Sequence, residues 1–118
     1  MLKKIRIMFY VQNVETISQF WQEKLGAELI ENQPLPKGLS NAILKISGEI
    51  EFVIFPRDFI AEVSPEVLDS TPSLMLYRED FEELHERLNP SAELMTVDQT
   101  ATFNFTDPEG NYFVIAKA

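Results

Sequence analysis

Two stretches with the same pattern decide the fold: Ile7-Met8-Phe9-Tyr10 and Leu74-Met75-Leu76-Tyr77. Each is a short apolar run that ends in tyrosine, and each is followed three residues later by a residue type that caps helices, Asn13 or Asp80. Two further pairs of segments repeat in the same order: Ala27–Ile30 with Ala92–Met95, and Phe52–Phe55 with Phe113–Ala116. Three matched pairs at a nearly constant offset indicate two copies of one structural module.

Hydrophobic periodicity predicts the order β-α-β-β-β for the first copy. Residues 5–11, rich in β-branched and aromatic side chains, are expected to form a strand. Asn13 is expected to cap a helix that runs to about Leu25, where Gly26 ends it. Further strands are expected at 27–31, 42–47 and 50–56, with a Pro- and Gly-containing loop at 32–41.

The second copy repeats this order. A strand is expected at 73–78, a helix at 81–88, a strand at 92–96 and a hairpin at 101–106 and 111–117, whose turn is Asp107-Pro108-Glu109-Gly110. A linker joins the copies, and Ser64-Pro65-Glu66 within it has the pattern of a short helix start. The predicted class is therefore α+β, with one domain over 1–118: module one at about 1–56, the linker at about 57–72 and module two at about 73–118.

Composition and charge exclude several classes of function. The chain has 118 residues, 45% of them hydrophobic, which fits one globular domain. It has no cysteine, so disulfides, thiolate metal sites and cysteine nucleophiles are excluded. Its net charge of −9 disfavours nucleic acid as a partner. The apolar run near the N-terminus stops at Val11, too early for a signal peptide or a membrane span, so we expect a cytoplasmic protein without a membrane partner.

The repeat resembles the vicinal-oxygen-chelate superfamily, which contains glyoxalases, bleomycin-resistance proteins and dioxygenases. The segments that carry the resemblance are Tyr10–Glu15, Phe20-Trp21, Leu25-Gly26 and the closing run Phe105–Asn111, with its DPxGN pattern before an apolar strand. The resemblance implies a curved mixed sheet around a cleft, with the helices on the outer face. It also implies a homodimer, because members of the superfamily commonly pair their modules across a two-fold axis.

The resemblance also locates the positions of a metal site. In metal-dependent members, His, Glu or Gln side chains project into the cleft from the first and fourth strands of each module. The corresponding positions here are Arg6, Val53, Ser73 and Val114. Valine has no donor atom, a guanidinium is a permanent cation and a lone serine hydroxyl is a poor ligand. We therefore expect no metal ion and no other cofactor, and we expect the only histidine, His85, to be an exposed helix residue.

Strand alternation predicts which side chains line the cleft. If Arg6 and Ser73 point inward, residues at two-residue intervals along the same strands do so too. The predicted ligand-binding residues are Arg6, Met8, Tyr10, Glu51, Val53, Phe55, Ser73, Met75, Tyr77, Tyr112 and Val114. They describe an apolar, aromatic pocket with a few polar groups, which is typical of small-molecule sites. Arg6 could grip an anionic group of the ligand, or it could pair with Glu51 as a structural bridge.

These observations are compatible with three hypotheses for the function. The leading hypothesis is a glyoxalase/bleomycin-resistance-like protein that binds a small, partly aromatic ligand in the cleft without a catalytic metal. One alternative is a metal-dependent lyase, epimerase or dioxygenase of the same superfamily, or a metal-free acid–base mechanism through Glu51 and a tyrosine. A second alternative is a non-catalytic interaction module whose cleft is filled by large side chains such as Met8, Phe55, Met75 and Tyr77. The sequence identifies neither the ligand nor a catalytic residue.

Overall fold

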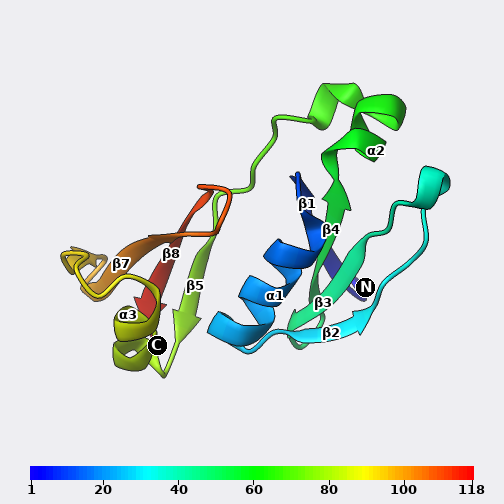
Figure 1. Cartoon of the computed structure of the whole chain (residues 1–118). Helices are drawn as coiled ribbons and strands as arrows, with labels where there is room; N and C mark the ends of the chain where they lie inside the picture. The colour runs from blue at the N-terminus through cyan, green and yellow to red at the C-terminus, as the bar shows by residue number, and fades with distance from the viewer. The chain divides into compact units, whose positions relative to one another are not determined.

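The computed structural model describes residues 1–118, which form two compact units, Met1–Pro72 and Ser73–Ala118 (Figure 1). Each unit contains one four-stranded mixed sheet. In each sheet the first strand pairs in parallel with the fourth, whereas the other neighbours are antiparallel. The α+β class and the two βαβββ modules predicted from the repeat are therefore confirmed. None of the helices has the length and the apolar composition that a membrane crossing requires.

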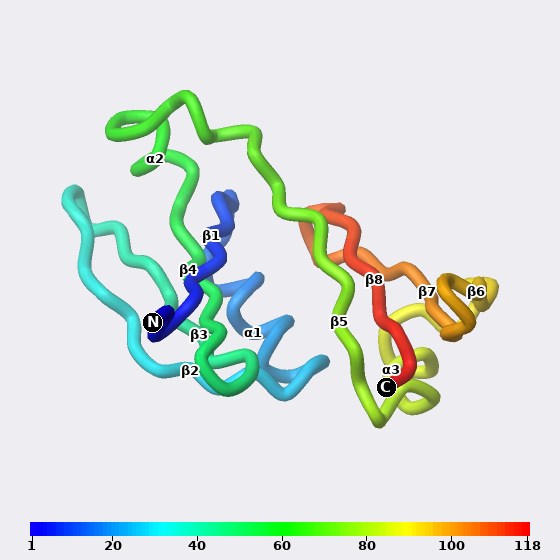
Figure 2. The backbone as a smooth tube through the Cα atoms, turned by 180° about the vertical axis from the view of Figure 1, so that it is seen from behind, coloured from blue at the N-terminus to red at the C-terminus, as the bar shows by residue number.

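The first unit follows the predicted order. Its sheet has the strand order β1-β4-β3-β2, and in the view from behind β1 and β4 run side by side (Figure 2). The elements are β1 (Ile5–Val11), α1 (Val14–Leu25), β2 (Glu28–Glu31), β3 (Ala42–Ser47) and β4 (Ile50–Pro56).

Helix α1 covers one face of this sheet (Figure 1). It begins where the Asn13 carboxamide oxygen accepts a hydrogen bond from the Thr16 backbone N–H at 3.0 Å, and it ends at Gly26, whose φ of 75° is left-handed. Trp21 is buried against the sheet, with its ring 4.9 Å from that of Phe52 in an edge-on arrangement. The opposite face of the sheet is not covered by α1, and every second side chain along each strand points to it.

The predicted linker contains a helix that the sequence analysis missed. Helix α2 (Arg57–Val63) follows β4 directly, and a 3-10 turn, η2 (Pro65–Val67), stands at the predicted helix start. A seven-residue helix is unstable by itself, and tertiary packing stabilises this one. The Phe59 ring stacks 6.1 Å from that of Phe55, and Ile60 is buried.

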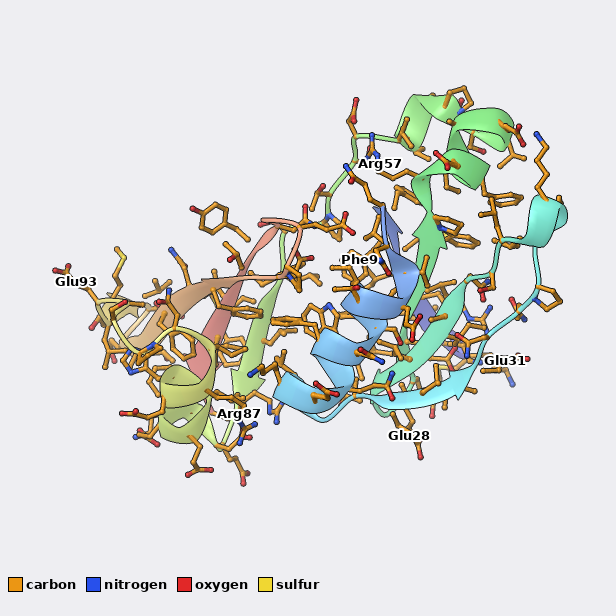
Figure 3. All side chains as sticks on the ribbon, in the orientation of Figure 1. Phe9, Glu28, Glu31, Arg57, Arg87 and Glu93 are labelled. Atoms are coloured by element: carbon orange, nitrogen blue, oxygen red, sulfur yellow. The ribbon has the colours of Figure 1, made fainter.

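Two ion pairs fix the segments around α2. The Arg57 guanidinium donates to the Leu68 carbonyl at 2.8 Å and to the Asp69 carboxylate at 3.1 Å (Arg57 is labelled in Figure 3). The 3-10 turn η1 (Pro36–Gly38) lies in the predicted loop 32–41, and its Lys37 pairs with Glu62 of α2. The turn η1 and the segment at 68–69 are therefore both tied to α2.

The second unit repeats the topology with the strand order β5-β8-β7-β6. Its elements are β5 (Met75–Arg78), α3 (Phe81–Leu88), β6 (Met95–Val97), β7 (Thr100–Thr106) and β8 (Tyr112–Lys117). Strand β6 lies later than the predicted 92–96. The reason is the tight turn after it, where Asp98 and Gln99 both have positive φ, 50° and 63°, so that pairing with β7 begins at Val97.

Helix α3 packs through Phe81 and Leu84, which are both buried. His85, expected to be exposed, is instead half-buried, with its ring 4.9 Å from that of Phe103 and its Nε2 2.9 Å from the Ala92 carbonyl oxygen. The segment 89–94 turns back over the helix, and this tertiary contact explains the difference. Asp80 stands at the helix start without capping it, because its carboxylate binds the Arg78 guanidinium through both oxygens at 2.9 Å.

The predicted turn before the last strand is present and is organised by one carboxylate. Asp107 is buried, and its Oδ1 accepts hydrogen bonds from the backbone N–H groups of Glu109 (2.9 Å) and Asn111 (3.0 Å). Its Oδ2 accepts from the Asn111 side-chain amide at 2.9 Å. The Gly110 N–H donates to the Asp107 carbonyl, which closes the turn at 3.0 Å.

Asp107→Ala is expected to lower the free energy of unfolding by about 3 kcal/mol, because it removes three hydrogen bonds and leaves partly buried donors unpaired. Asp107→Asn keeps an acceptor at Oδ1 and is expected to cost about 1 kcal/mol. Urea denaturation monitored by circular dichroism measures both values. Equal losses for the two variants would show that the side-chain acceptors do not organise the turn.

Candidate functional site

The face of the first sheet opposite to α1 carries the residues predicted for ligand contact on β1 and β4. Strand register pairs them directly, which puts their side chains on the same side of the sheet. We call this surface the first open face, and it contains the pairs Arg6 with Glu51, Met8 with Val53 and Tyr10 with Phe55.

One end of the first open face is a row of alternating charges. Glu28 lies opposite Lys45, Lys45 opposite Glu51, and Glu51 opposite Arg6, so the row crosses all four strands. Glu28 projects away from β2 in Figure 3. The Arg6 Nε donates to Glu51 Oε1 at 2.9 Å, and Lys4 Nζ lies 3.4 Å from Glu51 Oε2. The structural bridge considered in the sequence analysis is therefore present.

These contacts leave the arginine partly available. The Glu51 side chain is only 13% exposed, whereas that of Arg6 is 45% exposed. The hydrogen bond to Glu51 uses Nε, so the Nη end of the guanidinium can still donate to an anion. The Arg6 hydrogen bond lowers the pKa of Glu51 below its ordinary value of 4.5, with Lys4 adding to the shift and burial opposing it. Glu51 is thus a carboxylate held ionised between two cations.

The other end of the first open face is aromatic. The Tyr10 and Phe55 rings lie 6.4 Å apart, and Phe59 of α2 stacks on Phe55. Between the aromatic and charged ends lie Val53, which is buried, and Met8, which is 47% exposed. A planar apolar group could lie against Tyr10 and Met8 while a polar group reached Arg6.

The second unit has an equivalent surface, the second open face. Met75 lies opposite Val114, and Tyr77 opposite Ala116, while Tyr112 lies opposite Thr106. Tyr77 and Tyr112 are exposed by 62% and 71%, so neither is packed into a core. Ser73 precedes β5, which begins at Met75 rather than at the predicted residue 73. This face carries no charged residue among the predicted ones and offers hydroxyl groups instead.

The residues at the metal positions that the sequence resemblance implies do not fit a divalent ion. In the first unit the positions hold Arg6 and Val53, and in the second they hold Ser73 and Val114. Glu51, the carboxylate opposite Arg6, is already paired with two cations. No group of three or more His, Cys, Asp or Glu side chains is placed to hold a metal ion. Two valines and a guanidinium cannot supply the several oxygen or nitrogen donors that such an ion needs.

The sequence analysis missed several residues of the first open face, among them Glu28 on β2. Lys45 shares a face with Glu51 through the β3–β4 hairpin, and alternation along β3 would have placed it there. Lys4 lies before β1, and only the structure shows its contact with Glu51. Phe59 reaches the face from α2, an element that the sequence analysis did not predict.

Comparisons with known proteins identify the fold. No protein-family model and no curated protein sequence match the chain. Among solved structures, a member of the glyoxalase/bleomycin resistance protein/dioxygenase superfamily from Sphaerobacter thermophilus is 14% identical, with a TM-score of 0.76 over 100% of this chain and 98% of that one. A glyoxalase family protein from Enterococcus faecalis is 27% identical, with a TM-score of 0.66 over 98% and 96%.

An antibiotic-binding protein from a Streptomyces species is 17% identical, with a TM-score of 0.75 over 99% of this chain and 96% of that one. The chain therefore has the fold of the glyoxalase/bleomycin-resistance/dioxygenase superfamily, and the resemblance seen in the sequence is confirmed. A fold shared by binding proteins and enzymes does not decide the function.

Arg6→Met is expected to raise the pKa of Glu51 toward 4.5, because it removes the largest cause of the shift. Since the pKa of Glu51 is lower in the folded protein, its ionisation stabilises the fold above pH 4.5, and this contribution is lost as the pH falls through the folded pKa. A carboxyl-carbon NMR titration measures the pKa directly. Lys3→Met is the matched control, and an equal shift in both variants would contradict the assignment to Arg6.

Proposed function

We propose that this protein binds a small, partly aromatic molecule on its open faces without a catalytic metal ion. The observation that carries the proposal is the composition of the first open face. The exposed Met8 lies between a half-exposed arginine, Arg6, and an aromatic cluster formed by Tyr10, Phe55 and Phe59. Apolar surface with a few convergent polar groups is the usual make-up of small-molecule sites.

The charged row favours a ligand with an anionic group. Lys4, Arg6 and Lys45 supply three positive charges, and Glu28 and Glu51 supply two negative ones, so the row has a net charge of +1. The whole chain carries −9. This row is therefore locally cationic on an acidic protein, and Arg6 can donate from its Nη end to a carboxylate or a similar anion.

The second open face supports the same kind of ligand by different means. Its Tyr77 and Tyr112 rings are exposed, and each offers a hydroxyl group beside apolar surface from Met75 and Val114. An antibiotic-binding protein has the same fold, which supports small-molecule binding as a function of this architecture. From that protein we infer only small-molecule binding as a kind of function, because the residues of the open faces do not identify a particular drug.

The metal-dependent enzyme alternative lacks support from the donor set. A lyase, epimerase or dioxygenase of this superfamily would need donors at positions that hold Arg6, Val53, Ser73 and Val114. The metal-free alternative, with Glu51 as the base, is disfavoured by its lowered pKa, since a general base works best with a pKa near the working pH.

A naphthoate probe tests the ligand class. We expect 2-naphthoate to shift the amide NMR signals of β1 and β4 and to bind about tenfold more weakly to Arg6→Met, the loss of one charge-assisted contact. The neutral analogue 2-naphthylmethanol is expected to be insensitive to this variant. Lys3→Met is the control for charge alone. Equal sensitivity of both probes to Arg6→Met, or shifts confined to other elements, would contradict the proposal.

Metal dependence is tested by melting. Chelator-treated protein is expected to show the same melting temperature with and without Ni²⁺, Zn²⁺, Mn²⁺ or Fe²⁺. An ion that binds only the native state at a hundredfold excess over its dissociation constant would add about 2.7 kcal/mol of stability. A saturable rise with one of these ions would make the metal-dependent enzyme the better hypothesis.

A further inference from the structure

A polar groove lies on the other side of the first sheet, beside α1. It has a volume of about 590 Å³ and is lined by one flank of α1, including Glu15, Gln19 and Glu23, and by Leu29, Asn32 and Ser40. Leu29 pairs with Leu44, which pairs with Phe52 under Trp21, so the groove belongs to the helix-covered side of the sheet. It is therefore separate from the first open face, and its volume falls in the range of small-molecule sites.

The lining of the groove is acidic and rich in hydrogen-bonding groups. Glu15 and Glu23 contribute two carboxylates, neither takes part in an ion pair, and the lining contains no lysine or arginine. Gln22, also in the lining, donates its amide N–H to Ser18 Oγ at 2.9 Å, which leaves its carbonyl oxygen as an acceptor. The groove thus offers mainly acceptors and negative charge.

The spacing of the carboxylates sets the length of a ligand. Glu15 and Glu23 are eight residues apart on α1, which corresponds to about 12 Å along the helix axis. Side-chain acceptors on Gln19 and Gln22 lie between them in the sequence and line the same groove. Two separated anionic ends joined by neutral acceptors are complementary to an extended chain with an ammonium group at each end and a further amine between.

We propose that this groove binds a linear polyamine, with one terminal ammonium group at Glu15 and the other at Glu23. The inner amine donates to the glutamine acceptors, and the methylene segments lie against Val14 and Leu29. This site is additional to the ligand face proposed above and does not depend on it, because the two surfaces lie on opposite sides of the sheet and prefer opposite charges.

The test uses spermidine and a matched pair of double variants. Glu15→Gln/Glu23→Gln removes both carboxylates of the groove, and Glu83→Gln/Glu86→Gln makes the same change of charge on the exposed surface of α3. An exposed ion pair contributes up to about fivefold in affinity, so we expect titration calorimetry to show about tenfold weaker binding for the groove variant. The α3 variant is expected to change the affinity by less than about twofold.

Two further readouts locate the site. Spermidine is expected to shift the amide NMR signals of α1 and β2, and the shorter putrescine is expected to bind more weakly because it reaches only one carboxylate. Equal weakening in both double variants would mean that spermidine senses only the overall charge, and this would overturn the proposal. Absence of shifts at α1 and β2 would overturn it too. Arg6→Met is expected to leave spermidine binding unchanged, which separates this result from the test of the ligand face.

Discussion

Parallel pairing between the first and fourth strands of each unit, β1 with β4 and β5 with β8, governs the remaining structure. Parallel neighbours cannot be joined by a tight turn, and here the chain runs through a helix and two further strands before it returns to pair with the first strand. The crossover helix takes one face of the sheet and buries its apolar stripe there. The opposite face is left with side chains at two-residue intervals on adjacent strands, and this places Arg6 beside Glu51 and Tyr10 beside Phe55.

The sequence predicts elements whose stability is local and misses those that depend on tertiary contacts. The strand at 5–11 and the helix after Asn13 were predicted with their observed ends, because a β-branched run, a capping residue and Gly26 mark them within a few positions. Helix α2 has no such sequence signals at its ends. It is stabilised instead by tertiary packing, in which Phe59 stacks on Phe55 and Ile60 is buried. Strand β6 lies later in the chain than predicted because Asp98 and Gln99 form a tight turn with positive φ directly after it.

For the candidate site, the alternation of side chains along the strands correctly predicted which residues share a face. It did not predict which side chains bond to one another. The register brings together the predicted pairs on β1 and β4 and those on β5 and β8. Whether Arg6 would bind Glu51 depended on side-chain geometry that no sequence pattern encodes. The structure shows that bond together with a second cation, Lys4, so Arg6 has a structural partner and an exposed end at once.

The two sheets differ in how their outer antiparallel strands meet solvent. Strand β2 begins with Glu28 and ends with Glu31, whose side chains project outward (Figure 3), and carboxylates at an edge discourage a further strand from adding to it. Strand β6 carries Met95 and Val97, both exposed, and is limited only by its length of three residues. If the turn at Asp98 and Gln99 loosens and β6 lengthens, the second unit gains an apolar edge able to recruit another chain, so self-association under mild denaturation would begin at this hairpin rather than at β2.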